Sequence, residues 1–431
     1  MSSRIANIKG RRVWDSRGRP TVEVDVQLEG GAVGRAIAPA GASTGSGEAV
    51  DKRDGGDAFA GNDVTVAVAS VNGEIAKALA GEDAACQSTV DRILIELDGT
   101  ANKARLGGNA LVATSMSVAH AAAAWTGQPL WKYLAGETSD LLLPLPEIQI
   151  FGGGAHAGRR VDIQDFMVVA VGAKSYSQAL DWTAEIYRSA GALMAEAGLI
   201  GGVADEGGYW PAFSGNEQAL EFLVRAIERC GLKPGDEVAI SLDIAASDFG
   251  KEGRYKLARD AKVVDSDGLC EMLLGWLKRY PIIAIEDPVG EDDAQAMAAF
   301  TAAAGPYVQV VADDFICTSA SRITSAASIG ACNTALIKPN QVGTLSEANA
   351  ALEAANACRW NSIVSARSGE SEDVTIVHLA VGWRVKQLKV GSFARSERMA
   401  KWNEGLRIAE VLDAHGGRLP DRKLFPWGRS G

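Results

Sequence analysis

The sequence predicts an α/β fold built on a barrel of alternating strands and helices. The prediction rests on four short apolar runs, each of which ends in residues that can do chemistry: 238–243, 282–286, 308–313 and 334–338. The steps between them are comparable to the roughly 30 residues that a strand, a helix and a return to a parallel strand occupy. The runs do not alternate between apolar and polar residues, which is typical of parallel strands covered on both faces.

Charged side chains stand at the ends of these runs, namely Asp243, Glu286, Asp313 and Lys338. A (β/α) barrel collects the carboxyl ends of its strands at one rim, where such barrels keep their active sites. Three carboxylates at one rim repel each other, and a divalent cation removes that conflict. An all-oxygen ligand set favours Mg²⁺ over zinc. Lys338 would act as a base if the cation and the neighbouring Lys389 lower its pKa. Any one of these residues alone would be an ordinary solvated charge, so the prediction rests on the joint pattern.

Composition narrows the class of protein. The 431 residues are 47% hydrophobic and 23% charged, as expected for a folded chain with more than one core. The net charge of −11 argues against nucleic acid as a partner, but not against a small anionic substrate bound by a local cation. The longest apolar stretch, 109–125, contains Ser, Thr and His120, so we expect a packed helix and no membrane span. The six cysteines have no paired spacing and no signal pattern precedes them, which predicts a cytoplasmic protein.

Two domains are expected, 1–137 and 138–431. Within the first, alternating residues predict a hairpin of 22–28 and 33–38 with one solvated face, and three- and four-residue apolar steps predict helices at 64–79 and 109–125. Pro144 and Pro146 follow the join at 137–140.

The second domain is predicted to begin with a strand at 145–151. Helices follow at 176–197 and 217–230, before the four runs described above, and further strands are expected at 363–368 and 387–391.

Nine ordered segments then carry a resemblance to the enolase family over about residues 4–412. They are Asp15–Val24, Gly41–Gly45, Gly153–His156, Asp205–Gly208, Ser241–Ser247, Ile285–Pro288, Lys338–Leu345, Arg367–Glu370 and Ala394–Arg398. The tail after Asp413 shows no such resemblance.

The resemblance implies an enolase-type ββαα(βα)₆ barrel with an N-terminal α+β cap domain. It also implies Mg²⁺ as cofactor, with Asp243, Glu286 and Asp313 as its ligands. Lys338 and Glu206 match the family's catalytic base and acid.

Further site residues follow from the same resemblance. Asp165 stands where enolases have a glutamate that assists the acid, and His156 matches a histidine aimed into the active site. Lys389 matches the lysine that binds the substrate carboxylate. Arg367 and Ser368 match the pair that binds the substrate phosphate, called the phosphate grip below, and Gln164 stands beside Asp165. The remaining substrate-binding positions belong to a loop that acts as a lid in enolases: Ala40, Gly41, Ala42 and Ser43.

Enolases pair through their small domain, and Glu23 with Arg407 matches an ion pair across that interface. A homodimer or a higher homo-oligomer is therefore expected, with a small phosphorylated or phosphonate substrate as the ligand.

Three site positions depart from the enolase pattern. Ala40 replaces the lid serine that contributes to a second Mg²⁺ site, Asp165 replaces glutamate, and Ala366 replaces a histidine beside the phosphate grip. Three changes around one ligand favour an altered substrate, as in the carboxyphosphonoenolpyruvate synthases of phosphonate antibiotic pathways. These relatives join an enolpyruvate unit derived from 2-phosphoglycerate to a nucleotide-activated phosphonoformate. The alternatives are an ordinary glycolytic enolase and a catalytically silent binding relative.

Overall fold

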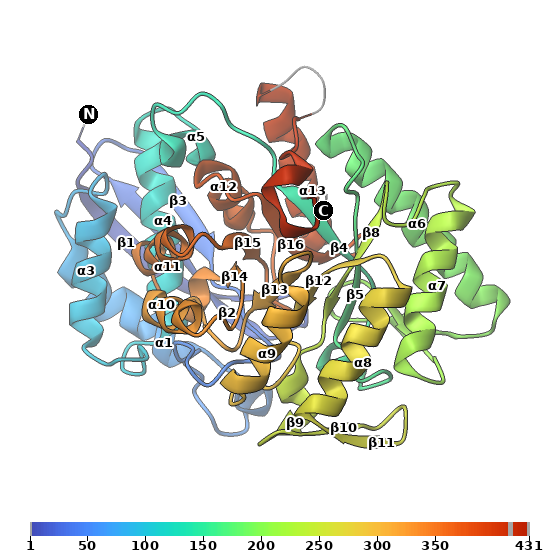
Figure 1. Cartoon of the computed structure of the whole chain (residues 1–431). Helices are drawn as coiled ribbons and strands as arrows, with labels where there is room; N and C mark the ends of the chain where they lie inside the picture. Colours follow the sequence, from blue (N-terminus) through green and yellow to red (C-terminus); the bar gives the residue numbers. More distant parts are fainter. Residues whose placement is uncertain (1, 413–416, 429–431) are drawn as a thin grey trace.

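The computed structural model of the chain describes residues 2–412 and 417–428 (Figure 1). The first part of the chain forms an antiparallel sheet of β1 (Ile5–Trp14), β2 (Pro20–Leu28) and β3 (Val33–Ile37). The predicted hairpin is present as β2 and β3, and β1 was not foreseen. The polar face of β2 is less solvated than expected: Glu23 is buried and forms an ion pair with Arg11 of β1.

Helices cover this sheet. They are α1 (Thr65–Ser70), a π-helical turn (Val71–Ile75), α2 (Ala76–Leu79), α3 (Gln87–Asp98), α4 (Gly108–Trp125) and α5 (Leu130–Ala135). The predicted helix at 64–79 corresponds to the first three of these, which follow one another without a break.

The helix α4 is buried almost all round because it lies between the sheet and the barrel. Ser117 Oγ donates a hydrogen bond to the carbonyl of Val24 at 2.8 Å. A Cβ on Gly34 would lie 2.1 Å from the Ser117 carbonyl oxygen, so glycine permits this close packing. No helix within residues 2–412 and 417–428 is long and apolar enough to cross a membrane.

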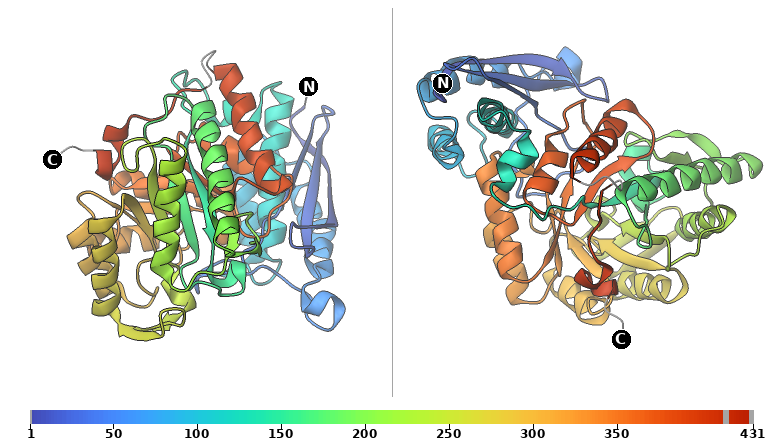
Figure 2. Two further views of the ribbon diagram at one scale, coloured as in Figure 1. Left: turned by 90° about the vertical axis from the view of Figure 1, so that its right-hand side faces the viewer. Right: turned by 90° about the horizontal axis from the view of Figure 1, so that it is seen from above.

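A closed barrel forms the centre of the molecule (Figures 1 and 2). In the described part of the chain its strands, in order around the barrel, are β4 (Leu145–Gly152), β5 (Asp165–Val169), β8 (Ala239–Asp243), β12 (Ile282–Glu286), β13 (Gln309–Ala312), β14 (Thr334–Ile337), β15 (Asn361–Ser365) and β16 (Gln387–Ser392). Pairing of β16 with β4 closes the ring. The strand β5 is antiparallel to both neighbours, and the other pairs are parallel.

The barrel helices are α6 (Tyr176–Glu196), α7 (Asn216–Arg229), α8 (Ser266–Arg279), α9 (Ala294–Ala304), α10 (Ala320–Ser328), α11 (Leu345–Ala357), α12 (Thr375–Gly382) and α13 (Ser396–Leu412). Taken with the strands, their sequence order is ββαα(βα)₆, which confirms the expected architecture. The division at residue 137 stays a prediction.

Two small additions lie outside the barrel. The short strands β6 (Ile200–Val203) and β7 (Tyr209–Pro211) extend the sheet beside β4. Between β8 and α8, a separate antiparallel sheet of β9 (Gly250–Lys251), β10 (Arg254–Leu257) and β11 (Lys262–Asp265) is inserted, at the bottom of Figure 1. This insertion explains why the step from Asp243 to Glu286 is the longest between the predicted strand ends.

The described part of the tail, 417–428, covers the end of the barrel opposite the carboxyl ends of its parallel strands. Phe425 is fully buried in a cluster with Leu145 and Ala239. Trp427 stacks on Phe425 and donates its indole N–H to Gln309 Oε1 at 2.9 Å. Since Gln309 is the first residue of β13, the tail acts as a structural plug.

A histidine pair joins α4 to α12, with His378 buried and His120 partly buried. The rings of His120 and His378 are 6.0 Å apart and nearly perpendicular, and His120 Nε2 lies 2.8 Å from Thr375 Oγ1. His378 also lies near Glu404, at 3.5 Å. Burial, and then the neighbouring His120, lower the pKa of His378 to about 4.

Acidification is therefore expected to destabilise this junction. Below a pH of about 6.5 the unfolded chain binds a proton at His378 that the native state does not take up until pH 4, so stability falls as the pH drops through this window. The loss amounts to about 3 kcal/mol. Denaturant titrations from pH 7 to pH 4 should show a shallower decline for His378→Asn than for the unchanged protein. Equal declines in the two proteins would contradict the assignment.

Candidate active site

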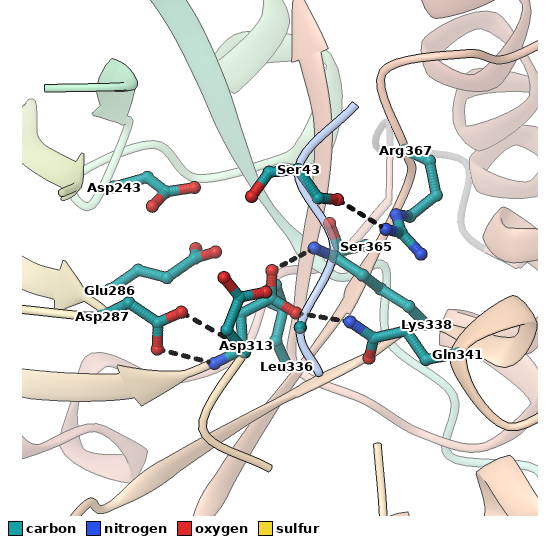
Figure 3. A network of polar contacts seen from close by, with 12 residues as sticks. Ser43, Asp243, Glu286, Asp287, Asp313, Leu336, Lys338, Gln341, Ser365 and Arg367 are labelled. Atoms are coloured by element: carbon teal, nitrogen blue, oxygen red, sulfur yellow. Dashed lines mark hydrogen bonds and ion pairs between the residues drawn. The ribbon is translucent and has the colours of Figure 1, made fainter. Parts of the chain in front are cut away.

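The residues predicted for chemistry lie at one rim of the barrel (Figure 3). Asp243 is the last residue of β8 and Glu286 the last of β12, and the two are paired in the parallel register. Asp313 and Lys338 come directly after β13 and β14. The apolar runs fold as strands because their alternate side chains fill the barrel interior and the helix layer, which brings the polar residues that end them to the same edge.

One small pocket at this rim brings together most of the predicted site. The predicted residues that line it are Ser43, Gln164, Asp165, Glu206, Asp243, Asp313, Lys338, Arg367, Ser368 and Lys389. Ala366 lines it as well. Glu286 reaches the site through Lys389, and the side chain of His156 lies outside the described residues.

Lys389 holds two of the predicted metal ligands together. Its Nζ lies 2.7 Å from Asp243 Oδ2, 2.7 Å from Glu286 Oε2 and 3.6 Å from Asp165 Oδ2. Burial lowers the pKa of Lys389, but Asp243 and Glu286 outweigh it and hold the pKa well above its ordinary value. The lysine is therefore a fixed cation inside the barrel.

Lys338 forms a short ion pair with Asp313, which also accepts a 2.8 Å hydrogen bond from Gln341 (Figure 3). Burial lowers the pKa of Lys338, and Asp313 raises it; the net result is a pKa above the ordinary value. Within the protein itself, the attraction of Asp313 and Glu286 exceeds the repulsion by Arg367 and Lys389. That a bound cation together with Lys389 lowers the pKa of Lys338 stays a prediction.

The donor set fits a hard cation. Glu286 Oε1 is buried and has no hydrogen-bond partner among the described residues. Burial, and then Asp243, raise the pKa of Glu286 well above its usual range, so this carboxylate needs a compensating positive charge to stay ionised. Gln164 Nε2 orients Asp243 through a 3.0 Å hydrogen bond to Oδ2. These are oxygen ligands of the kind that Mg²⁺ prefers.

A second acidic cluster lies beside the first. Carboxylate oxygens of Asp287, Asp313 and Asp314 lie within 4.8 Å of one another, close enough to hold a metal. The two sets share only Asp313. Asp287 accepts hydrogen bonds from the backbone N–H groups of Asp313 and Asp314, at 3.0 and 2.9 Å. Burial, and then Asp313, raise the pKa of Asp287 to about 8 and that of Asp314 to about 9.

Among the described residues, Asp287, Asp313 and Asp314 are the carboxylates whose oxygens lie within 4.8 Å of one another. Asp243 and Asp313 line the pocket, so which of the two sets holds the ion stays a prediction. Asp287 already clamps the end of β13, and neither Asp287 nor Asp314 lines the pocket. Sequence reasoning passed over both residues, although each directly follows a predicted ligand in the chain.

The predicted lid lies across Arg367. Ala42 N donates to Ser368 Oγ at 3.0 Å, and Arg367 Nη2 donates to the carbonyl of Ser43 at 3.0 Å. A Cβ on Gly41 would lie 2.0 Å from Arg367 Nη2, so glycine is needed for this approach. Ala40 is buried and bridges to Gly369.

Arg367 has a carboxylate partner that the sequence did not reveal. Glu48 accepts from both of its terminal nitrogens, at 2.9 and 3.1 Å, a bidentate arrangement of the kind that also suits phosphate. Burial lowers the pKa of Arg367, but Glu48 outweighs it, so this pKa lies above its ordinary value. Glu48 stands three residues after Gly45, the end of the segment Gly41–Gly45, and that proximity is the only sequence signal for its role.

Two polar residues of β4 were also missed. Gln149 donates to Asp165 Oδ1 and accepts from the N–H of Gly208 at 2.9 Å, so it ties Asp165 to the loop that carries Glu206. Glu147 receives a short hydrogen bond from Ser241. Both are buried. Their spacing of two in an otherwise apolar strand was the available signal, because it places both on the barrel interior.

Comparison with family models gives two matches. The model described as "Enolase, C-terminal TIM barrel domain" matches residues 140–418, and the model described as "Enolase, N-terminal domain" matches residues 5–134.

Proposed function

The chain belongs to the enolase family, and on that premise we propose that it is a Mg²⁺-dependent lyase acting on 2-phosphoglycerate or a close phosphorus analogue. It removes the proton α to the carboxylate and gives an enolpyruvyl product. The observation that carries the proposal is the pocket in which Lys338, Lys389, Glu206 and the ends of the metal strands meet.

Each residue has a distinct task in this reaction. Mg²⁺ held by Asp243, Glu286 and Asp313 would supply positive charge beside the substrate carboxylate. Lys389 adds a second fixed cation, which stabilises the charge that develops when the proton leaves. Lys338 Nζ takes that proton, which requires its neutral form; a cation at Asp313, together with Lys389, would lower the pKa of Lys338 for this role.

The other residues handle the leaving hydroxyl and the phosphorus group. Glu206 helps the β-hydroxyl leave, and Asp165 supports it from the neighbouring wall of the pocket. The phosphorus group is bound by Arg367, Ser368 and the lid residue Ser43. Because Glu48 accepts hydrogen bonds from both terminal nitrogens of Arg367, it must give up at least one of them when the phosphorus group binds.

A specialised relative is favoured over an ordinary glycolytic enolase. Ala366 and Asp165 both line the pocket, and each is smaller than the residue that enolases have there. An alanine in place of the imidazole at position 366, next to Arg367 in the chain, would suit a substrate that is bulkier at phosphorus. We therefore propose a carboxyphosphonoenolpyruvate synthase or a similar enzyme of phosphonate biosynthesis. A catalytically silent relative is disfavoured, because Asp243, Glu286, Asp313, Lys338 and Lys389 are all retained.

A coupled assay for phosphoenolpyruvate formation tests this proposal. With 2-phosphoglycerate and Mg²⁺, the rate should lie well below that of a glycolytic enolase measured alongside. An ordinary rate would reject the specialised function in favour of the glycolytic one. Complete inactivity together with no Mg²⁺ binding would favour the silent relative.

Assembly is a separate proposal. We expect a cytoplasmic homodimer, or a higher homo-oligomer, formed through the N-terminal domain. Glu23 pairs with Arg11 within the chain, while Arg407 lies largely exposed beside Glu404. Light scattering at micromolar concentration should give at least twice the chain mass of 45.1 kDa, and a monomer would contradict the expectation. Arg407→Glu should shift the equilibrium towards the monomer, whereas Arg188→Glu, another exposed arginine paired within its own helix, should not.

A further inference from the structure

A second pocket opens next to the candidate active site. Its volume is about 520 Å³, within the range of sites for ligands the size of a small drug or cofactor. One wall is the loop that follows β4, with Gly154 and Arg159, and the other is the segment from Ser247 to Ala258 that includes β9 and β10. None of the residues proposed above for catalysis, metal binding or substrate binding lines it.

Four cationic side chains line this pocket, which we call the basic pocket: Arg159, Lys251, Arg254 and Lys256. All four are exposed. Within the described residues, no ion pair or side-chain hydrogen bond engages any of them. Four uncompensated cations in one hollow of a chain with a net charge of −11 create a local positive field that favours an anion.

The two carboxylates of the pocket do not cancel this field. Asp162 is committed to the protein: it accepts from the backbone N–H groups of Ala258 and Arg259 and from Asn216. Asp248 Oδ1 lies 3.4 Å from the hydroxyl of Ser43. With two carboxylates against four cations, the hollow keeps a net positive charge.

The basic pocket also offers an aromatic surface. Phe249 lines it and is held edge-on against Tyr255, with ring centroids 6.2 Å apart. An aromatic face beside clustered cations is the combination that binds a nucleotide, with the base stacked and the phosphate paired. A single inorganic phosphate would fill only a small part of 520 Å³.

The basic pocket and the active-site pocket share a wall. Ser43 lines the active-site pocket, and its hydroxyl contacts Asp248 of the basic pocket. On the other side, Gly153 N donates to the carbonyl of Gln164 at 2.7 Å, and Gln164 lines the active-site pocket. The two pockets therefore lie side by side, separated by the contact between Ser43 and Asp248.

We propose that the basic pocket binds the nucleoside monophosphate portion of an activated second substrate, with the phosphate at Arg159, Lys251, Arg254 and Lys256 and the base on Phe249. The inference rests on the proposed function in one respect: the basic pocket would be the place where the nucleotide-activated phosphorus compound binds. The binding itself requires no turnover and is tested separately.

Calorimetric titration of the full chain with CMP, AMP and inorganic phosphate provides the test. The nucleotides should bind, and the double variant Arg254→Ala/Lys256→Ala should weaken their binding at least about tenfold. The matched control is Lys262→Ala, an exposed lysine of the same small sheet that lies outside the basic pocket; it should change the affinity by less than about twofold. Phe249→Leu keeps an apolar side chain and should weaken CMP and AMP but not inorganic phosphate.

The outcomes separate this inference from the proposed function. No nucleotide binding at millimolar concentration, or equal losses in the double variant and the Lys262→Ala control, would overturn the basic pocket as a nucleotide site. Inorganic phosphate binding as tightly as CMP would overturn the nucleoside part of the proposal. An ordinary enolase rate with 2-phosphoglycerate would reject the specialised function while leaving a measured nucleotide affinity intact.

Discussion

Replacing Asp243 with alanine is expected to abolish catalysis and the Mg²⁺-dependent rise in melting temperature together. Asp243 ends β8 and lines the pocket opposite Asp313. A ligand present at 100 times its dissociation constant stabilises the native state by about 2.7 kcal/mol, and this increment disappears when the ion no longer binds. Thermal unfolding with and without Mg²⁺ measures the effect without relying on activity.

The matched control for this variant is Asp314→Asn. Asp314 belongs only to the second acidic cluster and does not line the pocket, so its loss should leave the Mg²⁺ response in place. The opposite pattern, with the response lost in Asp314→Asn and kept in Asp243→Ala, would move the metal to the cluster of Asp287, Asp313 and Asp314. Asp287 is unsuitable as a control because it also clamps the backbone of Asp313.

Restoring the three departures from the enolase pattern should increase dehydration of 2-phosphoglycerate. The combined variant is Ala40→Ser, Asp165→Glu and Ala366→His. Each restored charge-assisted contact is worth about 1.5–3 kcal/mol, or roughly ten- to a hundredfold in rate. Because the lengthened Asp165 must also keep its hydrogen bond from Gln149, the full gain is not expected. Phosphoenolpyruvate formation should rise at least about tenfold.

A second measurement distinguishes a change of substrate from general repair. The imidazole at position 366 refills space beside Arg367, so use of a bulkier phosphonate should fall in the same variant. The Mg²⁺-dependent stabilisation should persist, since none of the three positions belongs to the set of Asp243, Glu286 and Asp313. Faster phosphoenolpyruvate formation with no loss on the phosphonate would contradict the specialised reading.

The sequence by itself determined the positions of the strand ends and the chemical character of the rim. Short apolar runs without alternation, repeated at the spacing of strand–helix units, are typical of parallel strands covered on both faces, so Asp243, Glu286, Asp313 and Lys338 could be assigned to successive strand ends before any contact was known. The strand order came from the family resemblance and not from spacing. The sequence could not reveal β1 or the role of the tail, because each depends on a partner distant in the chain: β2 for β1, and Gln309 for Trp427.

Tertiary structure alone decided which charges meet. Lys389 lies between Asp243 and Glu286, and Glu48 grips Arg367 across 319 positions of sequence. The same closure of the barrel buries Lys338, which lowers its pKa, and places Asp313 beside it, which outweighs burial and raises that pKa. Likewise, the basic pocket unites Arg159, from the loop after β4, with Lys256 of β10. The physical reason is that the periodicity of a sequence fixes only which face of a helix or strand a side chain occupies. Electrostatic energies depend on distances between side chains of different elements. Those distances are set by the strand register and by closure of the barrel.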